Sequence, residues 1–113
     1  MRYWTVEEAS AYLPRVRELL GAIRGVAAAV ARAPGNGHGP LGAGRQVREA
    51  LAELEGGDII VRDAEQGLID FHARGGDGVV YYLCWKHPEP DLGYWHLPEE
   101  GFAGRKPLPR DPQ

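Results

Sequence analysis

A run of seven residues, Val79 to Trp85, most constrains the fold of this chain. It reads VVYYLCW and carries an apolar or aromatic side chain at every position. Successive side chains of a strand point to opposite faces of a sheet, so a strand of this composition needs cover on both faces. The run therefore predicts a central strand, and it predicts that both surfaces of the sheet meet protein rather than water.

The N-terminal part of the chain has the periodicity of a helix. Thr5 and Glu8 form a capping-box pattern, which marks the helix start. Apolar residues then recur in alternating steps of three and four, which is a heptad-like spacing: Val6, Ala9, Leu13, Val16, Leu20, Ile23, Ala27 and Val30. Tyr12, Leu19 and Val26 widen this stripe, so we expect the helix to contact a sheet, a second helix and another subunit. Pro14 predicts a kink in the third turn.

Residues 34–44 contain five glycines and no apolar period, which predicts a flexible connector. A second helix is expected at 45–55, where apolar residues return at helical spacing and Gly56 and Gly57 follow. The two helices would form an antiparallel hairpin over residues 5–55.

The period changes to that of strands after Gly57. Strands are expected at 58–62, 68–71, 79–85 and 94–97, separated by segments rich in Gly, Pro and Asp. The predicted fold class is α+β, with a kinked two-helix hairpin packed on a small three- to four-stranded antiparallel sheet at 58–97. Residues 1–106 would form one domain, and residues 107–113 an extended tail.

Composition limits the classes of function. With 113 residues and a net charge of -3, the chain has one domain and no basic patch, which argues against a nucleic-acid partner. Its single cysteine forms no internal disulfide, which favours a reducing compartment. The acidic N-terminus is unlike a signal peptide, and no apolar run is long enough for a membrane span. We expect a cytoplasmic protein with no membrane partner.

Several runs in the C-terminal half resemble a known family. They are Asp63–Phe71, Leu83–Lys86, Gly93–His96 and Gly101–Leu108, joined by the N-terminal Trp4–Ala9 and Leu13–Pro14. The chain resembles a family of short prokaryotic proteins catalogued as domain of unknown function 2203. That resemblance implies the outline of the fold and no reaction. The chain departs from the family pattern at His72, His87 and Pro98, so the resemblance implies no role for them.

Asp70 is the first candidate for a functional residue, because it interrupts an apolar strand between Ile69 and Phe71. Its carboxylate must be paired, hydrogen-bonded or exposed, so the structural interpretation is either a salt bridge, with Arg105 as a candidate partner, or exposure at the edge of a strand. The alternative is a binding role. Asp70 and His72 share a strand face, and a metal triad with His96 is one form of that alternative. The leading interpretation includes no metal and no cofactor.

Other residues of this half have similar alternatives. Cys84 is expected to be a small apolar core residue, and a nucleophile pair with His96 is the functional alternative. Glu89, between two prolines, is interpreted as a solvated turn acid, a hydrogen-bond acceptor from His96 or a salt-bridge partner of Arg105. The segment 101–106 offers glycine amides and cations that suit an anion.

The leading functional hypothesis is a non-enzymatic, homodimeric interaction module. Its basis is the wide apolar helix stripe together with a strand that is apolar on both faces. A coiled-coil scaffold also fits the heptad spacing, but Pro14 weakens it. The rival hypothesis is a small-molecule or anion-binding domain, with enzymatic activity as an option. Its predicted site consists of Asp70, Trp85, Glu89, Trp95, His96 and Arg105.

Overall fold

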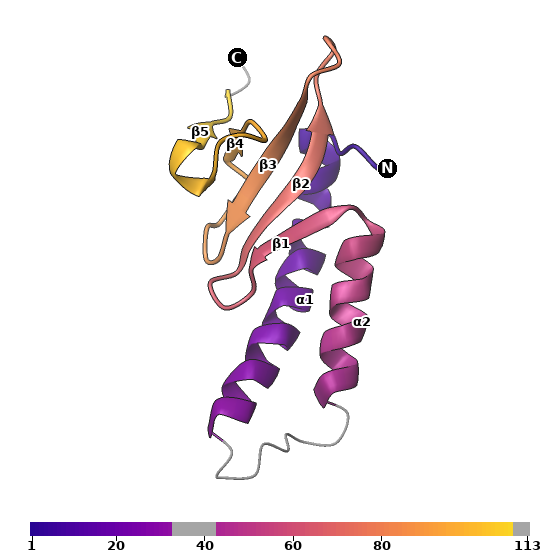
Figure 1. The fold of residues 1–113 in the computed structure, drawn as a ribbon, viewed down its shortest axis with the longest axis vertical. Helices are drawn as coiled ribbons and strands as arrows, with labels where there is room; N and C mark the ends of the chain where they lie inside the picture. Colours follow the sequence, from indigo (N-terminus) through magenta and orange to yellow (C-terminus); the bar gives the residue numbers. More distant parts are fainter. Residues whose placement is uncertain (33–42, 110–113) are drawn as a thin grey trace.

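The computed structural model of the protein describes the backbone of residues 1–32 and 43–109 and the side chains of residues 1–26 and 44–109. Two helices lead into a meander of strands (Figure 1). The elements are α1 (Val6–Arg32), α2 (Ala43–Gly56), β1 (Ile59–Asp63), β2 (Leu68–Arg74), β3 (Val80–Lys86), β4 (Tyr94–His96), the 3₁₀ helix η1 (Phe102–Gly104) and β5 (Lys106–Pro107).

The strands form one antiparallel sheet in the order β1-β2-β3-β4-β5. β3 lies at its centre, which confirms the prediction from VVYYLCW, and the α+β class is confirmed as well. The sheet has one strand more than the predicted maximum. Lys106 pairs with Trp95 and Pro107 with Tyr94, so the segment predicted as a tail from residue 107 begins inside the sheet. A two-residue strand is too short to show a period, and its proline is tolerated because β5 is an edge strand.

α1 begins at the predicted capping box. The Glu8 amide donates to Thr5 Oγ1 and the Thr5 amide donates to Glu8 Oε1, both at 3.0 Å. The helix includes Pro14 and runs antiparallel to α2 (Figure 1). The predicted connector at 34–44 lies outside the described residues up to 42, and its last two residues begin α2.

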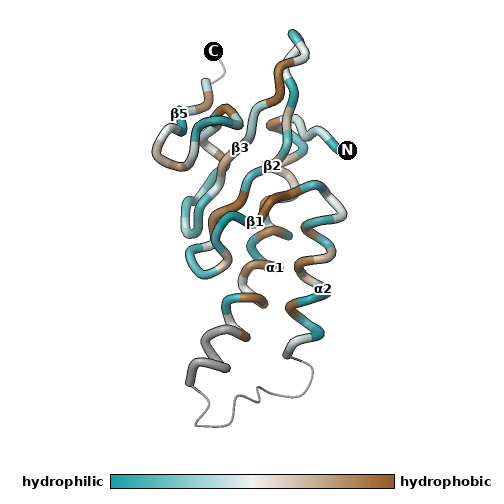
Figure 2. The backbone as a smooth tube through the Cα atoms, in the orientation of Figure 1, coloured by the Kyte–Doolittle hydropathy of each residue, from teal (hydrophilic) through white to brown (hydrophobic). Residues whose placement is uncertain are grey.

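The hydrophobic core lies between the helices and one face of the sheet. Register sets Ile59, Phe71 and Leu83 in one row across β1, β2 and β3, and each is at most 3% exposed. Leu13, Val16 and Leu20 of α1 belong to the same buried cluster. The amphipathic colouring of both helices is visible in Figure 2.

The wide stripe of α1 is largely covered within the chain. Leu19 is 6% exposed, and Tyr12 packs partly buried against the core. The Tyr12 hydroxyl also donates to Glu53 of α2 at 2.6 Å, beside two bonds from Arg15 to the same carboxylate. Over residues 6–26 of α1, whose side chains are described, the second helix and the sheet therefore cover most of this stripe.

Candidate functional site

The face of the sheet away from the helices carries polar residues at its centre. One row across it, from β1 to β5, contains Ile60, Asp70, Cys84, Tyr94 and Pro107. The neighbouring row contains His72, Tyr82 and His96. Asp70 is 1% exposed and His96 is 3% exposed, although both carry polar side chains. Burial of this kind in the middle of a sheet requires partners for every polar atom.

Asp70 has two partners. His96 Nε2 lies 3.0 Å from each carboxylate oxygen of Asp70, and Arg62 Nε donates to Oδ2 at 2.8 Å. Burial lowers the pKa of the Arg62 guanidinium, but the adjacent carboxylate outweighs this and raises that pKa overall. The expected salt bridge of Asp70 is confirmed, but its partner is Arg62 across the β1–β2 hairpin and not Arg105, which pairs with Glu89.

Both ring nitrogens of His96 are engaged. Nδ1 lies 2.8 Å from the carbonyl oxygen of Leu97, while Nε2 faces Asp70. A general base needs a free nitrogen within reach of the substrate proton. In this arrangement each ring nitrogen already faces an oxygen of the protein, so His96 holds Asp70 and the start of the following segment in place.

Cys84 completes the cluster from β3. The ligating atoms of Asp70, Cys84 and His96 all lie within 4.8 Å of one another, and all three residues are buried. Burial, reinforced by the Asp70 carboxylate and opposed by Arg105, raises the pKa of the thiol to about 12. The thiol is thus protonated at neutral pH, which argues against the Cys84–His96 nucleophile pair.

His72 lies outside this cluster, although the sequence suggested it as a metal ligand with Asp70 and His96. Its Nδ1 is 2.6 Å from the carbonyl oxygen of Asp58, and its ring packs edge-on against Tyr82 at a centroid distance of 5.2 Å. The group that the structure brings together therefore contains Cys84 in place of His72.

Glu89 and Arg105 form a separate ion pair beside the cluster, joined by two hydrogen bonds. The guanidinium also lies 3.9 Å from the ring centroid of Tyr94 and 4.2 Å from that of Phe102. Glu89 further accepts from the Lys86 amide at 2.8 Å. Of the three interpretations of Glu89, the salt bridge to Arg105 is confirmed. Because these contacts occupy Arg105, the pair fastens the 97–105 segment to the β3–β4 turn instead of gripping an anion.

A pocket of about 240 Å³ opens above the cluster, which we call the Asp70 pocket. Asp70, Cys84 and His96 belong to its lining, and the segment after β4 forms another wall. There Glu100 accepts from the Leu97 amide at 3.0 Å and from Lys106 Nζ at 2.6 Å, which holds that wall in place. The complete lining is Arg62, Leu68, Asp70, Cys84, His96, Pro98, Glu100, Gly101 and Phe102.

Two of the six predicted site residues lie on the other face of the sheet. Trp85 and Trp95 alternate with Cys84 and His96 along their strands, so they point toward the helix side. The Trp85 indole donates to the Glu89 carbonyl at 2.9 Å, and Trp95 packs against Tyr81. Asp70 and His96 line the pocket, while Glu89 and Arg105 support it.

Comparison with known proteins identifies the segment that contains this pocket. The model of the family described as Uncharacterized conserved protein (DUF2203) matches residues 42–108, which is more than half of the chain and runs from α2 to β5. The chain belongs to the DUF2203 family. The matched segment includes every residue that lines the Asp70 pocket.

No curated protein and no solved structure matches the chain significantly. Over the residues that the structure describes, neither helix is both long and apolar enough to cross a membrane. The DUF2203 description assigns no activity, so a functional proposal depends on the geometry of the site.

Proposed function

We propose that this DUF2203 protein binds a small polar ligand in the Asp70 pocket. The observation that carries the proposal is the buried Asp70–His96 pair, which lies at the base of a pocket rather than inside closed packing. Removing such groups from water costs several kcal/mol per ion before any pairing is counted. Apolar residues of similar size would not carry this cost. A polar cluster kept at this cost, beside a cavity, is typical of a functional site.

The dimensions and chemistry of the pocket restrict the ligand. A volume of about 240 Å³ is smaller than the roughly 300–1,000 Å³ of sites for drug-sized molecules. The ligand is therefore an ion or a molecule of a few atoms. Binding is favoured over acid–base or thiol catalysis, because both His96 nitrogens are engaged and the Cys84 thiol is protonated. A reducing cytoplasm is part of this proposal, since it would keep the thiol unmodified.

Nuclear magnetic resonance of the full chain tests the proposal. Zinc chloride, inorganic phosphate, sodium acetate and the small-molecule filtrate of a cell lysate would each be added to the labelled protein. We expect at least one probe to shift the Arg62 Nε–H and His96 ring signals. The Trp4 indole, which donates to the Gly57 carbonyl on the helix side, serves as the internal control.

The variants Asp70→Asn and Asp91→Asn complete that experiment. Asp91 is an exposed turn residue, so its substitution should leave the response unchanged. Asp70→Asn should remove it. If no probe moves the pocket signals of the wild-type chain, the proposed function is wrong.

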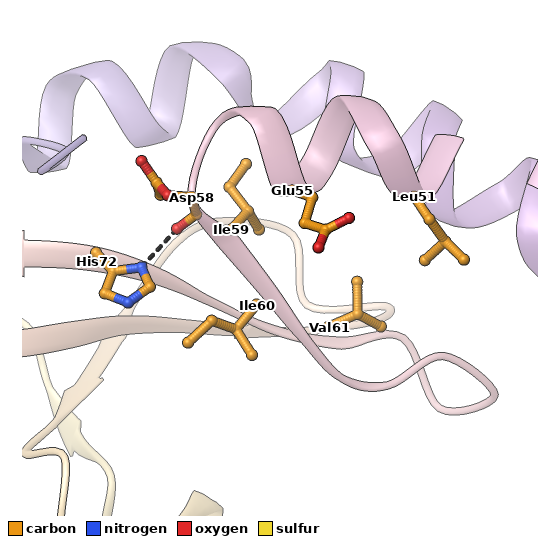
Figure 3. Close-up of a pocket in the computed structure, with 7 residues that line it drawn as sticks. All are labelled: Leu51, Glu55, Asp58, Ile59, Ile60, Val61 and His72. Atoms are coloured by element: carbon orange, nitrogen blue, oxygen red, sulfur yellow. Dashed lines mark hydrogen bonds between the residues drawn. The ribbon is translucent and has the colours of Figure 1, made fainter. Parts of the chain in front are cut away.

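A second candidate function, self-association into a homodimer, is favoured by the free edge of β1. Among the described residues, this strand ends the sheet and pairs only with β2. Beside it lies a groove of about 480 Å³ between α2 and β1, in which Leu51 is 37% exposed (Figure 3). The lining consists of Leu51, Glu55, Asp58, Ile59, Ile60, Val61 and His72. Edge strands next to apolar surface are a common route to strand addition.

We propose a second copy of this chain as the partner at this edge. An antiparallel pair of β1 strands centred on Ile60 would join the two sheets and bring the groove beside each β1 edge into the interface. Light scattering should give a dimer for the wild type at micromolar concentration and a monomer for Ile60→Lys, with Ile60→Thr as the uncharged control. A wild-type monomer under these conditions rejects this candidate.

A further inference from the structure

The three side chains at the base of the Asp70 pocket come from three neighbouring strands. Asp70 of β2 is directly opposite Cys84 of β3, and His96 of β4 lies in the adjacent row, opposite Tyr82. Carboxylate, thiol and imidazole atoms therefore converge within 4.8 Å on a rigid sheet. Such a set on regular strands is held more precisely than one on loops.

The contacts of His96 leave one position to be filled. Its two ring nitrogens face the Leu97 carbonyl and the Asp70 carboxylate, and these oxygens only accept hydrogen bonds. A neutral imidazole has one N–H, so it satisfies one of them. The other nitrogen requires either a second proton or a metal ion between it and the carboxylate. An Nδ1–H that donates to a backbone carbonyl, with Nε2 directed at other ligand atoms, is the usual arrangement of a metal-binding histidine.

We infer that Asp70, Cys84 and His96 bind one divalent transition-metal ion of the zinc type, through a carboxylate oxygen, Sγ and Nε2. This inference deepens the proposed function by naming the class of ligand. One oxygen, one sulfur and one nitrogen ligand suit zinc, whereas calcium and magnesium prefer oxygen ligands alone. Three protein ligands beside a pocket leave the fourth tetrahedral position for water or a small molecule.

Arg62 fits this site as a residue that positions Asp70. It donates to Oδ2, so Oδ1 is left to the metal ion. Outer partners of this kind orient metal-binding carboxylates. On binding, the Cys84 thiol gives up its proton, as a thiolate ligand must. The Arg62–Asp70 pair stays in place.

Titration with zinc and cobalt tests the inference. The full chain, freed of metal with a chelator, is titrated with Zn²⁺ by calorimetry and with Co²⁺ by absorption spectroscopy. We expect one ion per chain, and a thiolate-to-cobalt charge-transfer band that arises only when the sulfur is a ligand. Without that band, or without binding at all, the inference is wrong.

Two variants separate this site from adventitious binding. Cys84→Ser is almost isosteric and should fold, which circular dichroism verifies. It should nevertheless remove the cobalt band and weaken zinc binding by about 100-fold or more. Loss of an outer partner of a metal ligand typically weakens binding by roughly 10–100-fold. His87→Asn changes an exposed histidine and should leave both readouts unchanged. Equal zinc affinity in Cys84→Ser and the wild type contradicts the assignment.

The metal inference and the proposed function fail in different ways. If zinc leaves the Arg62 and His96 signals unchanged while phosphate, acetate or the lysate filtrate shifts them, the pocket binds another ligand and only the metal inference is wrong. If no probe shifts those signals, the metal inference and the proposed function are both wrong.

Discussion

The two faces of the sheet are built from alternating residues of the same strands, yet they differ in almost every physical respect. On the helix side, Ile69, Phe71 and Leu83 are fully buried among apolar neighbours. On the outer side, Asp70 and His96 are nearly as buried, but their neighbours are charged and polar. Burial alone therefore does not identify a hydrophobic core. The helix face provides stability, and ligand binding is the role that we propose for the outer face.

The largest expected effect is on the helix face. Phe71→Ala removes a ring that is 0% exposed and packs edge-on against Trp4 at a centroid distance of 5.1 Å. It should lower the free energy of unfolding by about 3–5 kcal/mol, as large-to-small core substitutions do. Urea denaturation measures the change. A loss below about 1 kcal/mol would show that this face is not the stabilising one.

The outer face should respond differently to single and combined changes. Asp70→Asn leaves Arg62 and His96 without their anion and should cost about 2–3 kcal/mol, below the roughly 3–5 for a fully buried pair, because the Arg62 side chain is 41% exposed. Replacing the whole network, with Arg62→Met, Asp70→Leu and His96→Leu together, should cost no more than about 1 kcal/mol, since apolar replacement of a complete buried ionic group is often neutral. Equal losses in both would mean that the cluster serves stability.

The ion pair that fastens residues 97–105 to the β3–β4 turn gives a smaller effect. Arg105→Lys keeps the charge but loses the paired hydrogen bonds to Glu89 and the contact with the Tyr94 and Phe102 rings. We expect the free energy of unfolding, measured by thermal denaturation, to fall by about 1–2 kcal/mol, which is the usual contribution of hydrogen bonds to charged groups. Hydrogen exchange should also speed up in residues 97–105. Unchanged exchange there would show that the pair does not hold this segment.

The smallest effect concerns the helix hairpin and appears only in acid. Hydrogen bonds from Arg15 and Tyr12 lower the pKa of Glu53 to about 2 from its ordinary 4.5. Because the folded-state pKa is the lower one, the stabilisation is complete above pH 4.5 and is lost as the pH falls toward 2. Glu53→Gln should flatten the stability profile between these values. Parallel profiles for Glu53→Gln and the wild type would contradict this.

Most of the fold follows from local patterns in the sequence. The capping box at Thr5 and Glu8 gave the start of α1, and VVYYLCW gave the central strand. The pattern also indicated that Asp70 and His96 are exceptional, because polar residues in apolar strands need a specific partner. It did not identify that partner. Between Val61 and Asp63 the register of β1 shifts, and Arg62 is the extra residue of this irregularity. Strand alternation does not predict the direction of a side chain at such a site.

The sequence alone determined the order of elements and the central position of β3, because periodicity and capping act over a few residues. It also identified Asp70 and His96 as exceptional polar residues in apolar strands. Tertiary structure alone decided that Cys84, rather than His72, joins Asp70 and His96, and that Trp85 and Trp95 lie on the opposite face. It also decided that Phe102 and Arg105 help to enclose the outer face, which the sequence had assigned to a partner chain. These outcomes depend on register between strands and on the path of residues 97–105. Both are set by contacts between residues far apart in the sequence.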